Sequence, residues 1–306
     1  MDVLSSPRAL RRWAVANLIA NMVIIWTGAL VRLTKSGLGC PTWPQCEPGS
    51  YVPTGELGIH GIIEFGNRLL TFVLAAIALA AFITALRLYR RQQAPRLLVG
   101  LTFGVGLGII AQAVIGGISV RMQLNPWVVG LHMVASVVLI LICVEIVHLS
   151  FAVRRAYAAP RLALLTRAVF VVGLIVIALG VVVTGAGPHS GDGGTQRNGF
   201  SPEWTAKLHA WSVWLIVGLT VLGILLAWSD ARLRRLWLGL LGVELLQGVI
   251  GYVQYFAHLP IAMVMLHMVG TTLFVAALGH LAFLTRNGSS VPASAPPRVG
   301  APGTSH

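Results

Sequence analysis

Long apolar runs separated by short polar stretches dominate the pattern of this 306-residue chain. A helix needs about 20 apolar residues to cross the hydrocarbon core of a membrane, and the chain offers such a run eight times. We therefore predict an all-α polytopic membrane protein with eight transmembrane helices. The expected spans are 13–33, 60–86, 97–120, 127–149, 164–186, 204–228, 235–256 and 260–284.

Two pairs of these helices repeat one pattern. The tetrapeptide LHMV begins at Leu131 and again at Leu266, and upstream QAVIGGISV from Gln112 matches QGVIGYVQY from Gln247 at the same offset. Four helices is an even number, so both halves enter the membrane in the same orientation. We expect two four-helix bundles related by a pseudo-twofold axis along the membrane normal.

The repeat also predicts how the chain is divided. The first helices of the two halves are related more weakly, since GALVRLTKSG from Gly28 resembles GVVVTGAGPHSG from Gly180 with a two-residue insertion. The tail is rich in Pro, Ser, Gly and Ala and is expected to be disordered. The predicted parts are an N-terminus 1–12, a first bundle 13–149 with an outside loop 34–59, a linker 150–163, a second bundle 164–284 and a tail 285–306.

Composition agrees with a membrane protein, since 56% of the residues are hydrophobic and 10% are charged. The net charge of +13 would suggest a nucleic-acid partner in a soluble protein, but here the position of the charges matters more. Sixteen of the 22 Lys and Arg lie in alternate loops and at both termini, so both termini are expected in the cytoplasm and no nucleic acid is expected. The other six are Arg32, Lys35, Arg68, Arg121, Arg197 and Lys207.

Three histidines lie in the outer part of the predicted membrane region. His132 and His267 belong to the repeat, roughly 7 to 8 Å into their helices, and His209 lies about as deep in the sixth helix. A titratable ring at that depth is costly unless it faces the bundle and has a partner. A hydrogen bond to a neighbouring helix would be the simplest role, but the repeat favours a shared function.

Imidazoles facing each other across a bundle can bind the two axial positions of a haem iron. We expect His209 and His267 to form such a pair in the second half. In the first half, alignment places Asn67 opposite the position of His209, so His132 is the one strong ligand there. Zinc fits less well, because no carboxylate or third imidazole converges on the pair.

The second predicted helix opens with HGIIEFGNR, which places His60, Glu64 and Asn67 on one helical face. Glu64 is a candidate general base or charge stabiliser beside the first site. An ion pair of Glu64 with Arg68 or with Arg32 is an equally good interpretation. His60 is expected at the water interface rather than on a metal.

Cys40 and Cys46 lie in the loop between the first two helices, separated by five residues. On the oxidising side of a membrane, such a pair can form a disulfide or act as a dithiol that exchanges electrons. A metal site fits less well without nearby histidines at ligand spacing. Cys143 stands alone in the fourth helix, where a small apolar filler is expected.

Taken together, these motifs resemble the heme A synthase family. The resemblance runs from about Trp13 to Leu284, and the combination of motifs is specific although each alone is weak. The family oxidises the C8 methyl group of haem O to a formyl group, giving haem A for cytochrome oxidase. The shared segments are GALVRLTKSGLGCPTWPQC, IIEFGNR, VVVTGAGPHSGD, the two LHMV helices and the QxVIG repeats.

The resemblance implies a role for each half of the chain. The second half would hold haem b through His209 and His267, and the first half would hold the substrate haem O with His132 as a ligand. Glu64 matches the catalytic glutamate of the family. Cys40 and Cys46 match the cysteine pair of one bacterial subclass.

One position departs from the family pattern. Three residues after the glutamate the family has a histidine, whereas this chain has Asn67. An amide oxygen is a poor iron ligand, so the substrate iron is expected to be five-coordinate or weakly six-coordinate. A different ligand such as His60, or reduced activity, is left open, but the retained Glu64, His132 and cysteine loop favour a working enzyme.

The resemblance also predicts chemistry and partners. The methyl would be oxidised through an alcohol and a gem-diol, with protons managed by Glu64 and electrons carried by haem b. The expected partners are the farnesyltransferase that makes haem O, cytochrome oxidase assembly and an unknown electron acceptor, and the oligomeric state is left open. A bacterial plasma membrane is expected. Candidate contacts for haem propionates are Arg32, Lys35, Arg68 and Arg121, with Arg197 and Lys207 also on the outer side.

Two other functions compete with this interpretation. A di-haem electron-transfer cytochrome would require four equivalent ligands, whereas Asn67 breaks that symmetry. A transporter would place its polar residues near the midplane, between helices broken by Gly or Pro. Here the polar residues cluster on the outer side.

Overall fold

The computed structural model describes residues 4–189, 191 and 194–287. Within these residues, eight helices are long and apolar enough to cross a membrane, which confirms the predicted fold class. They are α1 (Pro7–Leu33), α2 (Gly58–Arg90), α3 (Arg96–Arg121), α4 (Pro126–Ser150), α5 (Pro160–Ala186), α6 (Pro202–Leu226), α7 (Ala231–Phe256) and α8 (Ile261–Leu284), with a short 3-10 helix η1 (Gly55–Leu57) before α2.

Helix starts follow local capping chemistry. The side chain of Ser6 accepts a hydrogen bond from the backbone of Ala9, and Pro7 occupies the first turn, so α1 begins about six residues earlier than the hydropathy alone predicted. Asn125 and Asp230 cap α4 and α7 in the same way. These caps supply acceptors for backbone N–H groups that have no partner inside the helix.

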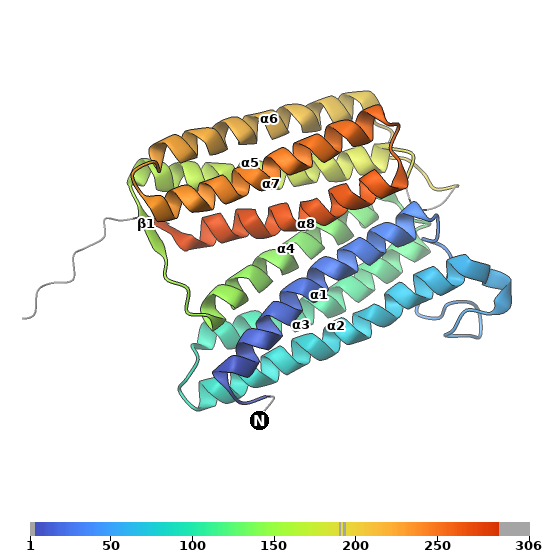
Figure 1. Ribbon diagram of the computed structural model, residues 1–306. Helices are drawn as coiled ribbons and strands as arrows, with labels where there is room; N and C mark the ends of the chain where they lie inside the picture. The colour runs from blue at the N-terminus through green and yellow to red at the C-terminus, as the bar shows by residue number, and fades with distance from the viewer. Residues whose placement is uncertain (1–3, 190, 192–193, 288–306) are drawn as a thin grey trace, which may run out of the picture.

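The helices form two groups of four. In each group consecutive helices pack side by side, and the fourth helix returns to the first, so α4 packs on α1 and α8 packs on α5. In Figure 1 the α1–α4 group lies below the α5–α8 group. Helix α8 also packs against α4 and α1 and so forms the joint between the groups. The pseudo-twofold relation between the two groups remains a prediction.

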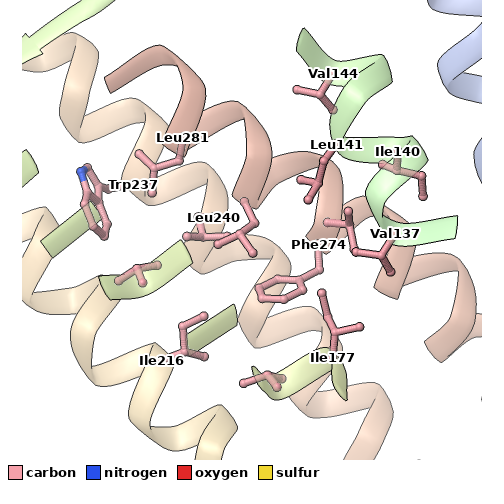
Figure 2. Close-up of a cluster of buried hydrophobic side chains, with 14 of the residues drawn as sticks. Val137, Ile140, Leu141, Val144, Ile177, Ile216, Trp237, Leu240, Phe274 and Leu281 are labelled. Carbon is pink, nitrogen blue, oxygen red and sulfur yellow. The ribbon is translucent and has the colours of Figure 1, made fainter. Parts of the chain in front are cut away.

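The largest apolar core lies at this joint and extends into the second group. Val137, Ile140 and Leu141 of α4 pack in one cluster with Phe274 and Leu278 of α8. Figure 2 shows side chains of this cluster projecting toward one another from several helices. Burial of such side chains against each other contributes about 1.5–3 kcal/mol each in water, whereas in lipid close packing supplies the association. The two halves are therefore joined by a continuous packed interior.

The linker and the tail contain structure that the sequence did not predict. Strand β1 (Ala156–Ala158) pairs in parallel with strand β2 (Thr285–Asn287), with Ala156 opposite Thr285. The prediction of disorder from residue 285 is therefore wrong for 285–287, because strand pairing gives their backbone groups partners. Residues 288–306 of the predicted tail lie outside the described residues.

Gly223 provides a test of the packing in the second group. A Cβ atom added at Gly223 of α6 would lie 2.3 Å from the ring of Trp237, which is fully buried in α7. Gly223→Ala should lower the thermal midpoint of the purified protein by several degrees, because overpacking costs about 1–3 kcal/mol. The matched control is Gly218→Ala on the same helix, where an added Cβ meets no described atom within 4 Å and should be neutral or stabilising. Equal midpoints for the two variants would contradict the packing.

Candidate functional site

His209 and His267 meet inside the second bundle. The ring centroids of His209 on α6 and His267 on α8 lie 6.5 Å apart, with the ring planes at 80°. Two metal–nitrogen bonds of about 2 Å, plus about 1.1 Å from each nitrogen to its ring centre, would place the centres of two imidazoles on one metal ion about 6.2 Å apart. The separation therefore fits one iron held between the rings, and it brings together two residues that the sequence had paired.

The ring of His209 is oriented by its neighbours on α5. Its Nδ1 donates a hydrogen bond to the backbone carbonyl of Val176 at 3.1 Å, which leaves the Nε2 lone pair free for a metal. Histidines that bind metals usually donate their other ring N–H in this way. Gly180, one turn further along α5, lies so close that a Cβ there would be 3.2 Å from Cε1 of the ring.

His267 is supported by the QGVIG segment of α7. The Gln247 side chain donates to the backbone carbonyl of His267 at 3.0 Å, and Gly251 faces the ring, with an added Cβ 3.5 Å from its Cε1. The Nδ1 atom of His267 is buried and has no hydrogen-bond partner among the described residues. An unpartnered buried nitrogen of this kind is costly unless a ligand or water completes the site.

The first bundle repeats this support around His132. Gln112 of α3 donates to the carbonyl of His132 at 3.1 Å, and an added Cβ at Gly116 would lie 3.4 Å from the ring. The Nδ1 atom of His132 is likewise buried and lacks a partner within the described part of the chain. The Gln and Gly of the repeated QxVIG motif thus perform the same two tasks, anchoring the helix that carries the histidine and leaving room for its ring.

Asn67 occupies the position that corresponds to His209, and it is already engaged. The hydroxyl of Thr27 on α1 lies 2.7 Å from the amide oxygen of Asn67 and donates to it. Gly28, which the alignment matched to Gly180, has no described atom within 4 Å of an added Cβ. The first site thus has one imidazole and an adjacent open space where the second site has two imidazoles.

His60 lies away from the bundle interior. It is exposed at the start of α2 and shares a hydrogen bond of 2.9 Å between its Nδ1 and the hydroxyl of Ser36. Both residues belong to the end of the molecule that carries the cysteine loop. His60 is therefore placed with the cysteine loop rather than with the ring of His132.

Cys40 and Cys46 form a disulfide, one of the two states that the sequence left open. The other two arrangements, a dithiol and a metal pair, are not present in this structure. Both cysteines are fully buried within the loop between α1 and α2. Cys143 is a free, buried cysteine in the packed interior of the first bundle, as expected.

Glu64 and Arg68 hold this loop against α2. Glu64 accepts a hydrogen bond from the backbone N–H of Cys40 at 2.7 Å, and its other oxygen pairs with Arg68 at 2.5 Å. Arg68 in turn donates to the carbonyls of Cys40, Thr42 and Gln45. The sequence left Arg68 and Arg32 as possible ion-pair partners of Glu64, and in the structure the partner is Arg68.

The contacts of Glu64 hold both oxygens of its carboxylate. Oε1 accepts two hydrogen bonds from Arg68, Oε2 accepts one from the backbone N–H of Cys40, and the backbone of Gly39 interacts with the same carboxylate. The side chain is only 6% exposed and lies one turn before Asn67 on the same helix.

Some of the cations considered as propionate contacts already have partners in the structure, and others do not. Arg68 is committed to the loop, and Arg121 donates to the carbonyl of Trp43 and lies 5.9 Å above its ring. The side chains of Arg32 and Lys35, at and just beyond the end of α1, make no hydrogen bond or ion pair with another described residue. Arg197 and Lys207 have local partners, namely the carbonyls of Gly187 and Pro188 for the first and Glu203 for the second.

Two polar contacts between α8 and the first group of helices were not predicted from the sequence. At the end of α4, buried His148 is bonded to His280 of α8 at 2.9 Å, and Glu145 beside it pairs with Arg155. Near the middle of α8, the indole of Trp26 on α1 donates to the hydroxyl of Thr272 at 2.9 Å. The only signal in the sequence was the presence of Glu145 and the two histidines within apolar runs, which marks intramembrane polar groups in general.

The chain is similar to known proteins over much of its length. The model of the COX15-CtaA family, described as cytochrome oxidase assembly protein, matches residues 11–189. That range includes Glu64, Asn67, His132 and the cysteine loop, whereas His209 and His267 lie beyond it.

Individual relatives share the name heme A synthase. The protein from Geobacillus kaustophilus (strain HTA426) is 35% identical over 114 residues, covering 37% of this chain and 34% of the relative. The protein from Lysinibacillus sphaericus (strain C3-41) is 31% identical over 183 residues, 58% of each chain, and that from Listeria welshimeri is 29% identical over 161 residues. The matches therefore span between a third and three fifths of the length of these relatives.

The clamp on the cysteine loop can be tested by protease sensitivity. Arg68→Gln removes the donors that hold the carbonyls of Cys40, Thr42 and Gln45, so the loop should open more often. A glutamate-specific protease should then cut after Glu47 or Glu56 several-fold faster than in the parent. Lys35→Gln, which alters an exposed cation outside the clamp, should cut at the parental rate. Unchanged cleavage of the Arg68 variant would refute the clamp.

Proposed function

Because the chain belongs to the COX15-CtaA family of cytochrome oxidase assembly proteins, we propose that it is a haem A synthase, which oxidises the C8 methyl group of haem O to a formyl group. The methyl carbon loses four electrons in this conversion and gains one oxygen. The protein must therefore hold the substrate, accept protons and pass electrons onward.

The histidine pair in the second bundle is the observation that carries the proposal. The rings of His209 and His267 have the separation expected of two imidazoles that would hold one iron, and the bond of His209 Nδ1 to the carbonyl of Val176 leaves its Nε2 for the metal. We assign to this pair a resident haem b, which would supply one-electron redox chemistry when bound. The role of the chain here is to fix both rings and to exclude water from the bundle interior.

The first bundle is assigned to haem O. His132 would be the one imidazole ligand of the substrate, because Asn67 is engaged by Thr27. One axial position would then be left without a strong protein ligand. A weaker hold on the iron suits a molecule that must enter as substrate and leave as product.

Glu64 is assigned to proton transfer at the first site. Its carboxylate can accept a proton, while the pair with Arg68 holds it in place. The same pair holds the disulfide loop, so the loop and the carboxylate are positioned together. Arg32 and Lys35, free of other described partners, are the strongest candidates for binding haem propionates.

The membrane setting and the partners are also proposals. The distribution of Lys and Arg supports cytoplasmic termini in a bacterial plasma membrane, with the histidines in the outer part. Haem O is too apolar to diffuse through water, so its delivery from the farnesyltransferase and the transfer of haem A to the oxidase would take place within the membrane. The electron acceptor and the oxygen source are left open.

A di-haem electron-transfer cytochrome is the alternative function. It would need a second imidazole in the first bundle, and the position of that imidazole is occupied by Asn67. The difference between the two halves therefore supports a substrate site in one and a cofactor site in the other.

Replacing Glu64 tests the proposed chemistry. Glu64→Gln keeps most of the hydrogen-bonding shape but removes the carboxylate, so haem A formation in cells that supply haem O should fall at least about 100-fold. The matched control is Arg68→Gln, which releases the loop but keeps the carboxylate and should retain measurable conversion. Extracted haems would be separated by chromatography. Normal conversion by the Glu64 variant would refute its catalytic role, and equal losses in both variants would assign it to the loop alone.

A further inference from the structure

A groove lies between the end of α2 and the beginning of α3, at the opposite end of the first bundle from the cysteine loop. Its cavity volume is about 590 Å³, within the range of sites for small molecules. Leu97 and Phe103 in its wall are about half exposed on apolar helices, so the groove opens toward lipid. Its lining includes Phe82 and Tyr89 of α2 and Arg96, Gly100 and Phe103 of α3.

The groove changes from apolar to cationic along its length. At its inner end the rings of Phe82 and Phe103 pack with centroids 5.6 Å apart. Tyr89 lies seven residues further along α2, about 10 Å closer to the helix end, and Arg96 begins α3 beside it. Gly100 leaves the wall open, since an added Cβ there meets no described atom within 4 Å.

Several cations at this end are free to bind an anion. The side chains of Arg87, Arg90 and Arg96 are exposed and make no hydrogen bond or ion pair with any residue the structure describes. Arg91, by contrast, donates to the backbone carbonyl of Ser5 at 3.1 Å. Arg96 lines the groove itself, and Arg87 and Arg90 add two unpaired charges in the last turn of α2.

The beginning of α3 adds backbone donors to these charges. Pro95 precedes the helix and provides no side-chain cap, so the N–H groups of Arg96 and Leu97 have no side-chain acceptor. Phosphate groups bind readily where a helix N-terminus and an arginine meet. An apolar slot ending in such a place matches a molecule with an acyl chain and a phosphate head.

We propose that this groove binds an anionic phospholipid of the leaflet on the arginine-rich side. One acyl chain lies against Phe82, Gly100 and Phe103, and the phosphate is held by Arg96 with Arg87 and Arg90 nearby. Basic pockets between membrane helices are known to bind anionic head groups in this way. A helix from a partner protein would fill the apolar part but would leave the cations unmatched.

Lipid titration of the full-length protein tests the site. The protein in detergent would be titrated with dioleoylphosphatidylglycerol, and bound lipid would be counted by native mass spectrometry. Arg96→Gln removes the phosphate ligand, and Gly100→Leu fills the slot. Arg96→Gln should weaken binding about fivefold or more, the effect expected for one basic side chain at an anionic surface. Gly100→Leu should weaken it by a similar factor. Dioleoylphosphatidylcholine should bind the parent protein more weakly by a similar factor.

Arg12→Gln is the matched control, since Arg12 is an exposed arginine of α1 outside the groove. It should change binding less than about twofold, and all variants should elute as the parent does in gel filtration. Binding unaffected by either groove variant would overturn the proposal. An equal loss of lipid binding with Arg12→Gln would mean attraction to surface charge alone. A loss with Arg96→Gln but not with Gly100→Leu would mean a head-group contact without a groove. Either result would overturn the proposal.

Discussion

The burial of a polar imidazole ring between apolar helices is the constraint on which both candidate sites depend. Gly116 and Gly251 lie beside the rings of His132 and His267, where an added Cβ would come into van der Waals contact, and at Gly180 an added Cβ would be tighter still, 3.2 Å from the ring of His209. A glutamine one turn away anchors the carbonyl of His132 or His267. A polar ring exposed to lipid is costly. The glycine positions beside the rings and the glutamine hydrogen bonds help to place these histidines inside the bundle.

The two halves use one framework for different purposes. The Gln, Gly and His positions of the repeat occur in both halves. The halves differ where Asn67 stands in place of an imidazole and where the disulfide loop packs on α2. Helix α8 carries His267 and also joins the halves, through Thr272 to Trp26 near the middle of the helix and through His280 to His148 near its end. The helix that supports the second site is therefore also the one that packs against the first half.

The sequence predicted the features that depend on local pattern or on a fixed repeat offset. Eight helices follow from hydropathy, and the pairing of His209 with His267 follows from depth and the repeat. It could not choose between Arg68 and Arg32 as the partner of Glu64, because that choice depends on how α1 and α2 pack. The His148–His280 contact and the β1–β2 pair were missed because no periodicity links such distant residues, whose partnership only tertiary packing creates.

The central claim is that the second half holds a permanent haem b between His209 and His267 while the first half holds a different haem. The most direct test is to purify the chain from cells that supply haem O, extract its haems and identify them chromatographically beside a His267→Ala variant. The account predicts haem b together with haem O or haem A in the parent, and selective loss of haem b in the variant. Haem b as the sole haem of the parent, or its full retention in the variant, would contradict the account.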